Sequence, residues 1–148
     1  MMSAMPWAHE TALPCDPGSI AACRHFVGLH LLEHGLGSMV DDAQLVVSEL
    51  ATNAVVHART PFVVVLSGVE GSVRLAVSDE SSTVPSQATP DACALEDETG
   101  RGLWLVRHLS QDWGVTTTAS GDKTVWASFD LPSSPGSARL DFAKRALG

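Results

Sequence analysis

The sequence lacks long apolar runs and is poor in cysteine. The longest apolar segment, Phe62–Leu66, has the length of a strand and falls well short of the ~20 residues that a membrane-spanning helix needs. Three cysteines, Cys15, Cys23 and Cys93, are odd in number and far apart in the chain. Neither a disulfide framework nor a paired-cysteine metal site is indicated, so we interpret them as small apolar residues.

Basic residues are also scarce. The chain has 9 Lys and Arg against 17 Asp and Glu, giving a net charge of -8 and an isoelectric point near 5.0. The basic residues are scattered, which argues against a direct nucleic-acid partner. The N-terminus lacks the basic and apolar segments of a secretion signal, so we expect a cytoplasmic protein with no membrane partner.

The length of 148 residues is typical of one domain with a single core. We expect a flexible N-terminus over residues 1–9, a domain over 10–131, and a tail over 132–148 that is either a short helix or loose chain. Residues 79–100 are rich in Ser, Thr, Pro, Asp and Glu without periodicity, which is typical of a functional loop such as a lid.

Hydrophobic periodicity predicts the elements inside this domain. Asp16-Pro17 is a typical helix start, and Ile20, Cys23, Val27 and Leu31 follow at helical spacing. The predicted helices cover residues 17–34, 40–58 and about 103–109, and the predicted strands cover 10–14, 62–67, 72–78, 113–119 and 123–131. Grouped helices and hairpin-linked strands predict an α+β two-layer sandwich, in which helices cover one face of a mixed, mostly antiparallel sheet.

The predicted helix 40–58 carries a polar stripe on an otherwise apolar surface. Glu49 and Asn53 lie four residues apart on one face, and His57 follows one turn later. A carboxylate among apolar neighbours needs water, a metal or a ligand group, which a cleft would supply. The alternative is a solvated margin on which Asn53 bonds a loop and His57 is an ordinary helix-end residue.

Two further features suit a ligand, one by binding a phosphate and the other by binding an amine. Gly100-Arg101-Gly102 precedes the third predicted helix, where flexible backbone and free N–H groups would stabilise a phosphate. Asp79 ends an apolar strand and could accept a hydrogen bond from an exocyclic amine, although a turn-forming Asp is the alternative. The chain contains no P-loop motif, so a P-loop site is not supported.

Three segments then occur in one order: Ser48-Glu-Leu-Ala-Thr-Asn-Ala-Val-Val-His57, Val77-Ser-Asp79 and Glu98-Thr-Gly-Arg-Gly-Leu103. Together they resemble the Bergerat-type (GHKL) ATPase superfamily of gyrase, MutL and sensor histidine kinases. More narrowly, they resemble the RsbW/SpoIIAB-type anti-sigma factors and serine-protein kinases of bacteria. The resemblance covers about residues 10–131 and implies a histidine-kinase-like ATPase fold with ATP and Mg²⁺ as cofactors.

The resemblance also implies roles for single residues. Asn53 would bind Mg²⁺, Glu49 would be the catalytic base towards a protein hydroxyl, and Asp79 would read the adenine amine. The implied nucleotide-binding set is Asn53, His57, Asp79, Gly100, Arg101, Gly102, Leu103 and Thr124, the last supporting the adenine pocket. Arg24 on the first helix falls where a partner-contacting arginine occurs in the family.

Two functions follow from this resemblance. The first is an ATP-dependent serine/threonine protein kinase that phosphorylates a STAS-type anti-sigma-factor antagonist and sequesters a sigma factor. The second is a non-catalytic protein-binding module, either nucleotide-gated or nucleotide-independent. It is motivated by Ser81, which stands where the family has a glycine that lets backbone pass close to adenine. A homodimer remains an alternative to a monomer.

His30 and His34 are four residues apart on the first predicted helix, a spacing that suits a metal ion. No third ligand is evident in the sequence. We therefore interpret them as surface residues, with a metal site as the minor alternative.

Overall fold

The computed structural model describes residues 6–69, 71–80, 105–118 and 121–131. Most of the predicted lid, the Gly100–Leu103 segment, Cys93 and the tail 132–148 lie outside these residues. The fold can therefore be judged on the sheet and on the helices that pack against it.

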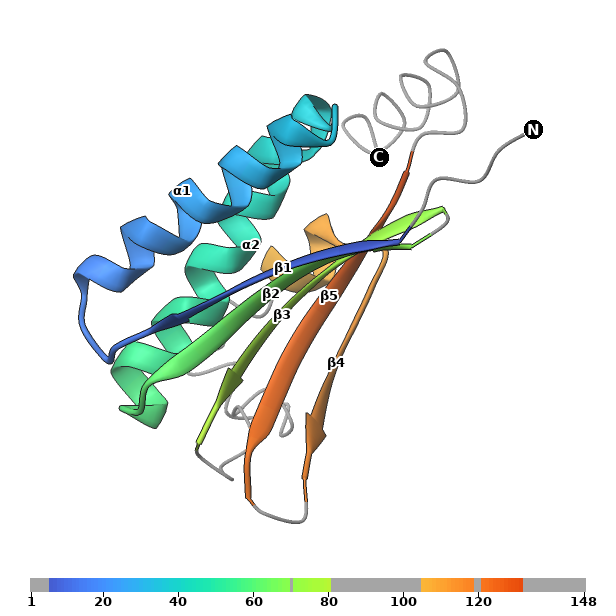
Figure 1. Cartoon of the computed structure of the whole chain (residues 1–148). Coiled ribbons are helices and arrows are strands. Elements are labelled where there is room, and N and C mark those ends of the chain that lie inside the picture. The colour runs from blue at the N-terminus through green and yellow to red at the C-terminus, as the bar shows by residue number, and fades with distance from the viewer. Residues whose placement is uncertain (1–5, 70, 81–104, 119–120, 132–148) are drawn as a thin grey trace.

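A five-stranded sheet forms one layer of the molecule and helices form the other (Figure 1). The strand order is β1-β2-β3-β5-β4. The strands are β1 (Trp7–Leu13), β2 (Phe62–Val69), β3 (Ser72–Asp79), β4 (Asp112–Thr117) and β5 (Lys123–Asp130). The expected α+β two-layer sandwich is confirmed.

The sheet differs from the expected mixed one, because all four of its pairings are antiparallel. β3 and β4 each pair antiparallel with β5, so they run in the same direction, but β5 lies between them. The long connection from β3 to β4 therefore joins two parallel strands that are not neighbours in the sheet. Residues 105–109 of this connection are helical.

Helix α1 (Gly18–Glu33) begins one residue later than expected, with Pro17 rather than Asp16 as its N-cap. Asp16 Oδ2 accepts the Gly18 N–H at 3.1 Å. Cys23, Val27 and Leu31 are fully buried, which confirms the predicted stripe. Burial raises the pKa of the Cys23 thiol to about 12, so this cysteine remains a neutral apolar side chain. In the described ranges, no helix combines the length and apolar character needed to cross a bilayer.

Helix α2 (Val40–Thr52) is shorter than the predicted 40–58. A 3₁₀ turn, η1 (Gly37–Met39), precedes it, and a π-helix, η2 (Asn53–Ala58), continues it. η2 ends at Arg59, which has a left-handed backbone (φ 59°) and donates its N–H to the Ala54 carbonyl at 2.8 Å. Apolar spacing predicts the position of this helix but does not distinguish an α-helical turn from a π-helical one. The wider π-helical turn begins at Asn53.

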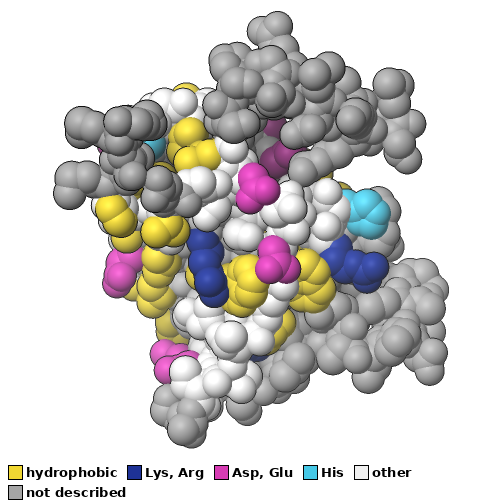
Figure 2. Space-filling model, turned by 90° about the vertical axis from the view of Figure 1, so that its right-hand side faces the viewer, with side chains coloured by type: hydrophobic (Ala, Val, Ile, Leu, Met, Phe, Trp, Pro, Cys, Tyr) yellow, Lys and Arg dark blue, Asp and Glu magenta, His cyan; other side chains and the backbone are white. Residues whose placement is uncertain are grey.

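Strand burial alternates, so one face of the sheet is covered and the other is open. Phe62, Val64 and Leu66 of β2 are buried under the helices together with Val73, Leu75 and Val77 of β3. The face turned away from α1 and α2 carries hydrophobic side chains interspersed with charges of both signs (Figure 2). On it, the Arg74 guanidinium lies 4.2 Å from the centre of the Trp126 ring.

Strand β1 begins at Trp7 rather than at Glu10, so part of the segment expected to be flexible belongs to the sheet. Trp7 pairs with Gly68 of β2, and its ring occupies the space above that glycine. Trp126 of β5 lies over Gly114 of β4 in the same way. Each edge strand is therefore joined to its neighbour by a tryptophan packed on a glycine.

We predict that Gly68→Ala destabilises the fold. A Cβ at this position would lie 2.3 Å from Trp7 Cε2, so the ring must move off the strand. The expected loss is about 1–3 kcal/mol in free energy of unfolding, measured by urea denaturation. Ser67→Ala, one residue away on the open face, is the control and should change stability by less than about 0.5 kcal/mol. Equal stability of the two variants would show that the Trp7 packing contributes little.

Candidate functional site

The junction of α2 and η2 carries the predicted helical site residues. Asn53 is the first residue of the π-helix and only 6 % exposed. Its Nδ2 has no hydrogen-bond partner in the part of the chain that the structure describes. Buried amides are nearly always hydrogen-bonded, so such an atom calls for an explanation, and a ligand is one. Glu49, one turn earlier, is half-buried.

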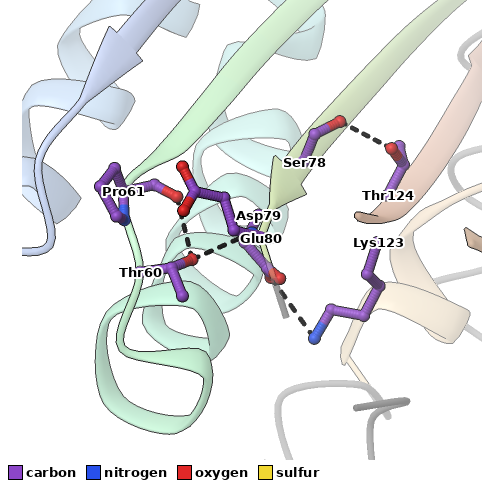
Figure 3. Close-up of polar contacts among 7 residues, drawn as sticks. All are labelled: Thr60, Pro61, Ser78, Asp79, Glu80, Lys123 and Thr124. Carbon is purple, nitrogen blue, oxygen red and sulfur yellow. Dashed lines mark hydrogen bonds and ion pairs between the residues drawn. The ribbon is translucent and has the colours of Figure 1, made fainter. Parts of the chain in front are cut away.

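Asp79 ends β3 on the face of the sheet that the helices cover, and is 4 % exposed. Because β3 packs against both α2 and η2, Asp79 and Asn53 belong to opposite layers of the same helix–sheet seam. The register pairs Asp79 with Lys123 of β5. Lys123 Nζ lies 3.3 Å from Asp79 Oδ2, and both side chains are almost fully buried (Figure 3).

The Thr124 side chain lies on the opposite face of the sheet from Asp79, because side chains alternate along β5. It pairs with Ser78, and the two hydroxyl oxygens lie 2.6 Å apart on the open face of the sheet. The Thr124 hydroxyl thus contacts Ser78, and its role in the adenine pocket stays a prediction. Lys123 is the β5 side chain that contacts Asp79. Sequence reasoning missed Lys123, although Lys123, Val125, Ala127 and Phe129 form an alternating stripe that points inward.

The end of β3 is fixed from the other side by Thr60. Its hydroxyl donates to the Pro61 carbonyl at 2.9 Å and accepts the Glu80 N–H at 3.1 Å (Figure 3). Glu80 is the last described residue before position 81, where the family glycine is replaced by Ser81. The backbone that leaves Asp79 is thus held by a side-chain hydrogen bond.

An open hollow of about 550 Å³ adjoins Asp79 at this end of the sheet. It lies over the ends of β1, β2 and β3 and includes neither Glu49 nor Asn53. Its lining residues are Ala12, Leu13, Pro14, Pro61, Phe62, Val63, Ser78, Asp79, Glu80 and Asp122. An apolar floor with carboxylates at its margin suits a flat apolar group that bears amines.

The residues present fit Mg²⁺ and a phosphate at Asn53. Mg²⁺ takes oxygen ligands and keeps several of its waters, so it needs few protein groups. The oxygen and nitrogen of an amide exchange places when the group turns over. Asn53 can therefore offer an oxygen to the cation or an N–H to a phosphate oxygen, and no described residue already takes the hydrogen bond of its buried Nδ2.

The remaining predicted residues either lie apart from this seam or fall outside the described residues. His57 is exposed on η2. Arg24 is exposed on α1, and its Nη1 donates to Ser48 Oγ of α2 at 3.2 Å, so it spans the outer side of the helix pair. The Gly100, Arg101, Gly102 and Leu103 set lies outside the described residues, and its phosphate role stays a prediction.

Comparison with known proteins gives one family match and two similar solved structures. The family model described as the histidine kinase-like ATPase domain matches residues 13–129. The RsbU and RsbW domains of Rv1364c from Mycobacterium tuberculosis share 19% identity with a TM-score of 0.61, over 85% of this chain and 33% of that chain. The SiaB–SiaC complex from Pseudomonas aeruginosa shares 15% identity with a TM-score of 0.56. The match covers 83% of this chain and 89% of that chain. No curated protein matches this chain.

These structural likenesses have clear limits. At 19% and 15% identity they show a shared fold alone. This chain also spans only about a third of the length of the Mycobacterium tuberculosis chain. Any activity or partner for this chain must therefore be argued from its own residues.

We predict that Lys123→Met costs about 3–5 kcal/mol in free energy of unfolding, because it leaves the buried Asp79 carboxylate without its cation. Adding Asp79→Asn should restore much of this loss, since no uncompensated charge remains. A double-mutant cycle in urea measures the coupling. Arg74→Met, on the open face, is the control and should cost less than about 1 kcal/mol. Additive effects of the two single changes would contradict a direct Asp79–Lys123 interaction.

Proposed function

Since this chain belongs to the histidine kinase-like ATPase domain family, we propose that it binds Mg-ATP in the seam between α2 and β3. We further propose that it transfers the γ-phosphoryl group to a serine or threonine hydroxyl of a partner protein. The observation that carries the proposal is the buried Asn53, whose Nδ2 lacks a partner among the described residues.

No described residue completes the hydrogen bonding of the buried Asn53 side chain, and a bound ligand would do so. Leaving a buried amide nitrogen unsatisfied costs about 1–3 kcal/mol, which a structural residue would be expected to avoid. A cation with attached phosphates supplies both an acceptor for the N–H and a site for the carbonyl oxygen. ATP with Mg²⁺ meets this requirement, and the family implies the same pair.

Glu49 lies one helical turn before Asn53 on the same face, so it would face the γ-phosphate end of such a ligand. Phosphoryl transfer depends mainly on positioning the groups and neutralising charge, and a carboxylate that accepts the attacking hydroxyl proton completes a minimal set. Bound Mg²⁺ would neutralise charge on the phosphates. Glu49 would take the proton from the protein hydroxyl.

Asp79 would bind the base end of the nucleotide, with Lys123 holding its carboxylate in place. A carboxylate has about four acceptor positions, so the contact between Lys123 and Oδ2 does not exhaust its capacity. An amine of the base can therefore bind beside the ammonium group. In this arrangement Lys123 is a positioning residue for Asp79.

The proposed protein substrate is a STAS-type anti-sigma-factor antagonist, and the proposed sequestered partner is a sigma factor. Sequence resemblance to the RsbW/SpoIIAB type is the basis for both. One solved neighbour holds the RsbU and RsbW domains of Rv1364c, and another is the SiaB–SiaC complex. Arg24, exposed where α1 meets α2, is the proposed contact for a protein partner.

A non-catalytic binding module is the second candidate function. It is favoured by the Asp79–Lys123 contact together with Ser81 in place of glycine, because an amine must share the carboxylate with a buried cation. In that case the chain would sequester its partner without using ATP. Calorimetry with ATP and ADP distinguishes the two: the absence of binding by the unaltered chain would exclude the kinase and leave sequestration standing.

We predict that Asn53→Ala separates binding from stability. The change should abolish the increase in ATP affinity that Mg²⁺ produces, measured by calorimetry in Mg²⁺ and in EDTA. The free energy of unfolding should stay within about 1 kcal/mol of the original, because the lost amide nitrogen had no described partner. A large loss of stability with unchanged Mg²⁺-dependent affinity would mean that Asn53 is purely structural.

We predict that Glu49→Gln lowers phosphoryl transfer by about a hundredfold or more while ATP affinity remains within a few fold. The assay follows labelled phosphate from ATP to serine or threonine of a candidate antagonist. Glu10→Gln removes an exposed carboxylate from β1 and is the matched control. Transfer that proceeds equally well in Glu49→Gln would rule out this residue as the base.

A further inference from the structure

A second cluster of ligating side chains lies away from the nucleotide site, where the start of β1 meets the end of α1. His9 comes from β1, while His30, Glu33 and His34 come from the last turn and C-cap of α1. One ligating atom each of His9, His30 and Glu33 lies within 4.8 Å of the others. The third ligand that the His30/His34 spacing lacked is thus supplied by a strand distant in the sequence.

Pairwise contacts connect the four side chains. His9 Nε2 lies 2.9 Å from His34 Nε2, and His30 Nδ1 lies 2.8 Å from Glu33 Oε1. The His9 and His30 rings stack at 3.8 Å, and the Trp7 ring stacks on His34 at 3.7 Å. Three imidazoles and a carboxylate are therefore already gathered, with aromatic packing that fixes two of the rings.

We propose that His9, His30, Glu33 and His34 form a binding site for a divalent transition-metal ion of the zinc type. Imidazole nitrogens with one carboxylate oxygen suit Zn²⁺, Cu²⁺ or Ni²⁺, whereas Mg²⁺ and Ca²⁺ take oxygen ligands. The site is separate from the Asn53 seam and does not depend on nucleotide binding.

Electrostatics favours a cation here over added protons. Burial, and to a smaller extent His30 and His34, lowers the pKa of His9, which favours the neutral imidazole, the form that binds metals. The hydrogen bond from His30 lowers the pKa of Glu33, so its carboxylate stays charged. The C-terminal end of α1 adds the negative end of a helix dipole. One cation can neutralise this site, whereas three protonated rings would repel one another.

Binding of an ion would require the rings to reorient locally. Ligand atoms around a tetrahedral ion with metal–nitrogen bonds of about 2.0–2.1 Å are roughly 3.3 Å apart. His9 Nε2 and His34 Nε2 would therefore separate slightly as the shared proton is replaced. An imidazole binds a metal in its ring plane, so His9 must also tilt out of its stack on His30. Glu33 is half-exposed, which leaves an entry path for the ion.

The chelator-treated full chain, without nucleotide, is titrated calorimetrically with ZnCl₂ and, separately, with MgCl₂. We expect saturable binding of one Zn²⁺ per chain and none of Mg²⁺ at this site. Glu33→Gln, His9→Ala and His34→Ala should each weaken Zn²⁺ binding about tenfold or more. His25→Ala removes an exposed histidine of the same helix outside the cluster and should leave the affinity unchanged. Zn²⁺ should also raise the melting temperature of the original chain, because it ties β1 to α1.

Glu33→Gln keeps the test decisive if His9→Ala weakens β1, because it alters one half-exposed side chain of nearly the same shape. Circular dichroism in EDTA checks the fold of each variant. The absence of saturable Zn²⁺ binding by the original chain would overturn the proposal. So would an affinity that is the same in folded Glu33→Gln as in the original chain.

Discussion

The pairing of β3 with β5 is the constraint on which the candidate site depends. Its register places Asp79 opposite Lys123 and Ser78 opposite Thr124, and strand alternation then sends each pair to a different face. A shift of β5 by one residue would turn its side chains to the other face, so Thr124 would be buried beside Asp79 and Lys123 would be exposed. The Asp79–Lys123 contact and the buried stripes of both strands therefore favour the same register, since a charge left alone in the seam would be costly.

On the helix side of the seam, by contrast, two features at Asn53 lower the stability of the fold. At Asn53 the helix changes from α to π, and a buried amide nitrogen is left without a described partner. Both features cost stability, and both occur at the same residue. Departures from local folding rules are expected at functional sites, which agrees with the proposed role of Asn53 in ligand binding.

Periodicity predicted the layers, the helix stripe of Cys23, Val27 and Leu31, and both hairpins, because burial on one face leaves a repeating signal in the sequence. The π-helix and the all-antiparallel sheet were not predicted, since they depend on turn width and on strand order rather than on apolar spacing. Asn53 and Asp79 were identified by motif. Lys123 and His9 were not predicted, because each is a candidate only through its contact with a residue on another element.

The choice between a kinase and a non-catalytic binding module depends on whether the Asp79 carboxylate can bind an amine of the base while it contacts Lys123. In an acidic chain, a nucleotide cannot rely on the overall field and needs local groups of the right sign. Lys123 supplies positive charge inside the seam, but it does so beside the group that would read the base. If it only orients Asp79, the site reads an amine with a fixed acceptor. If an incoming amine must displace it, the buried ammonium loses its counter-charge and base binding becomes unfavourable, whatever Asn53 contributes at the phosphates.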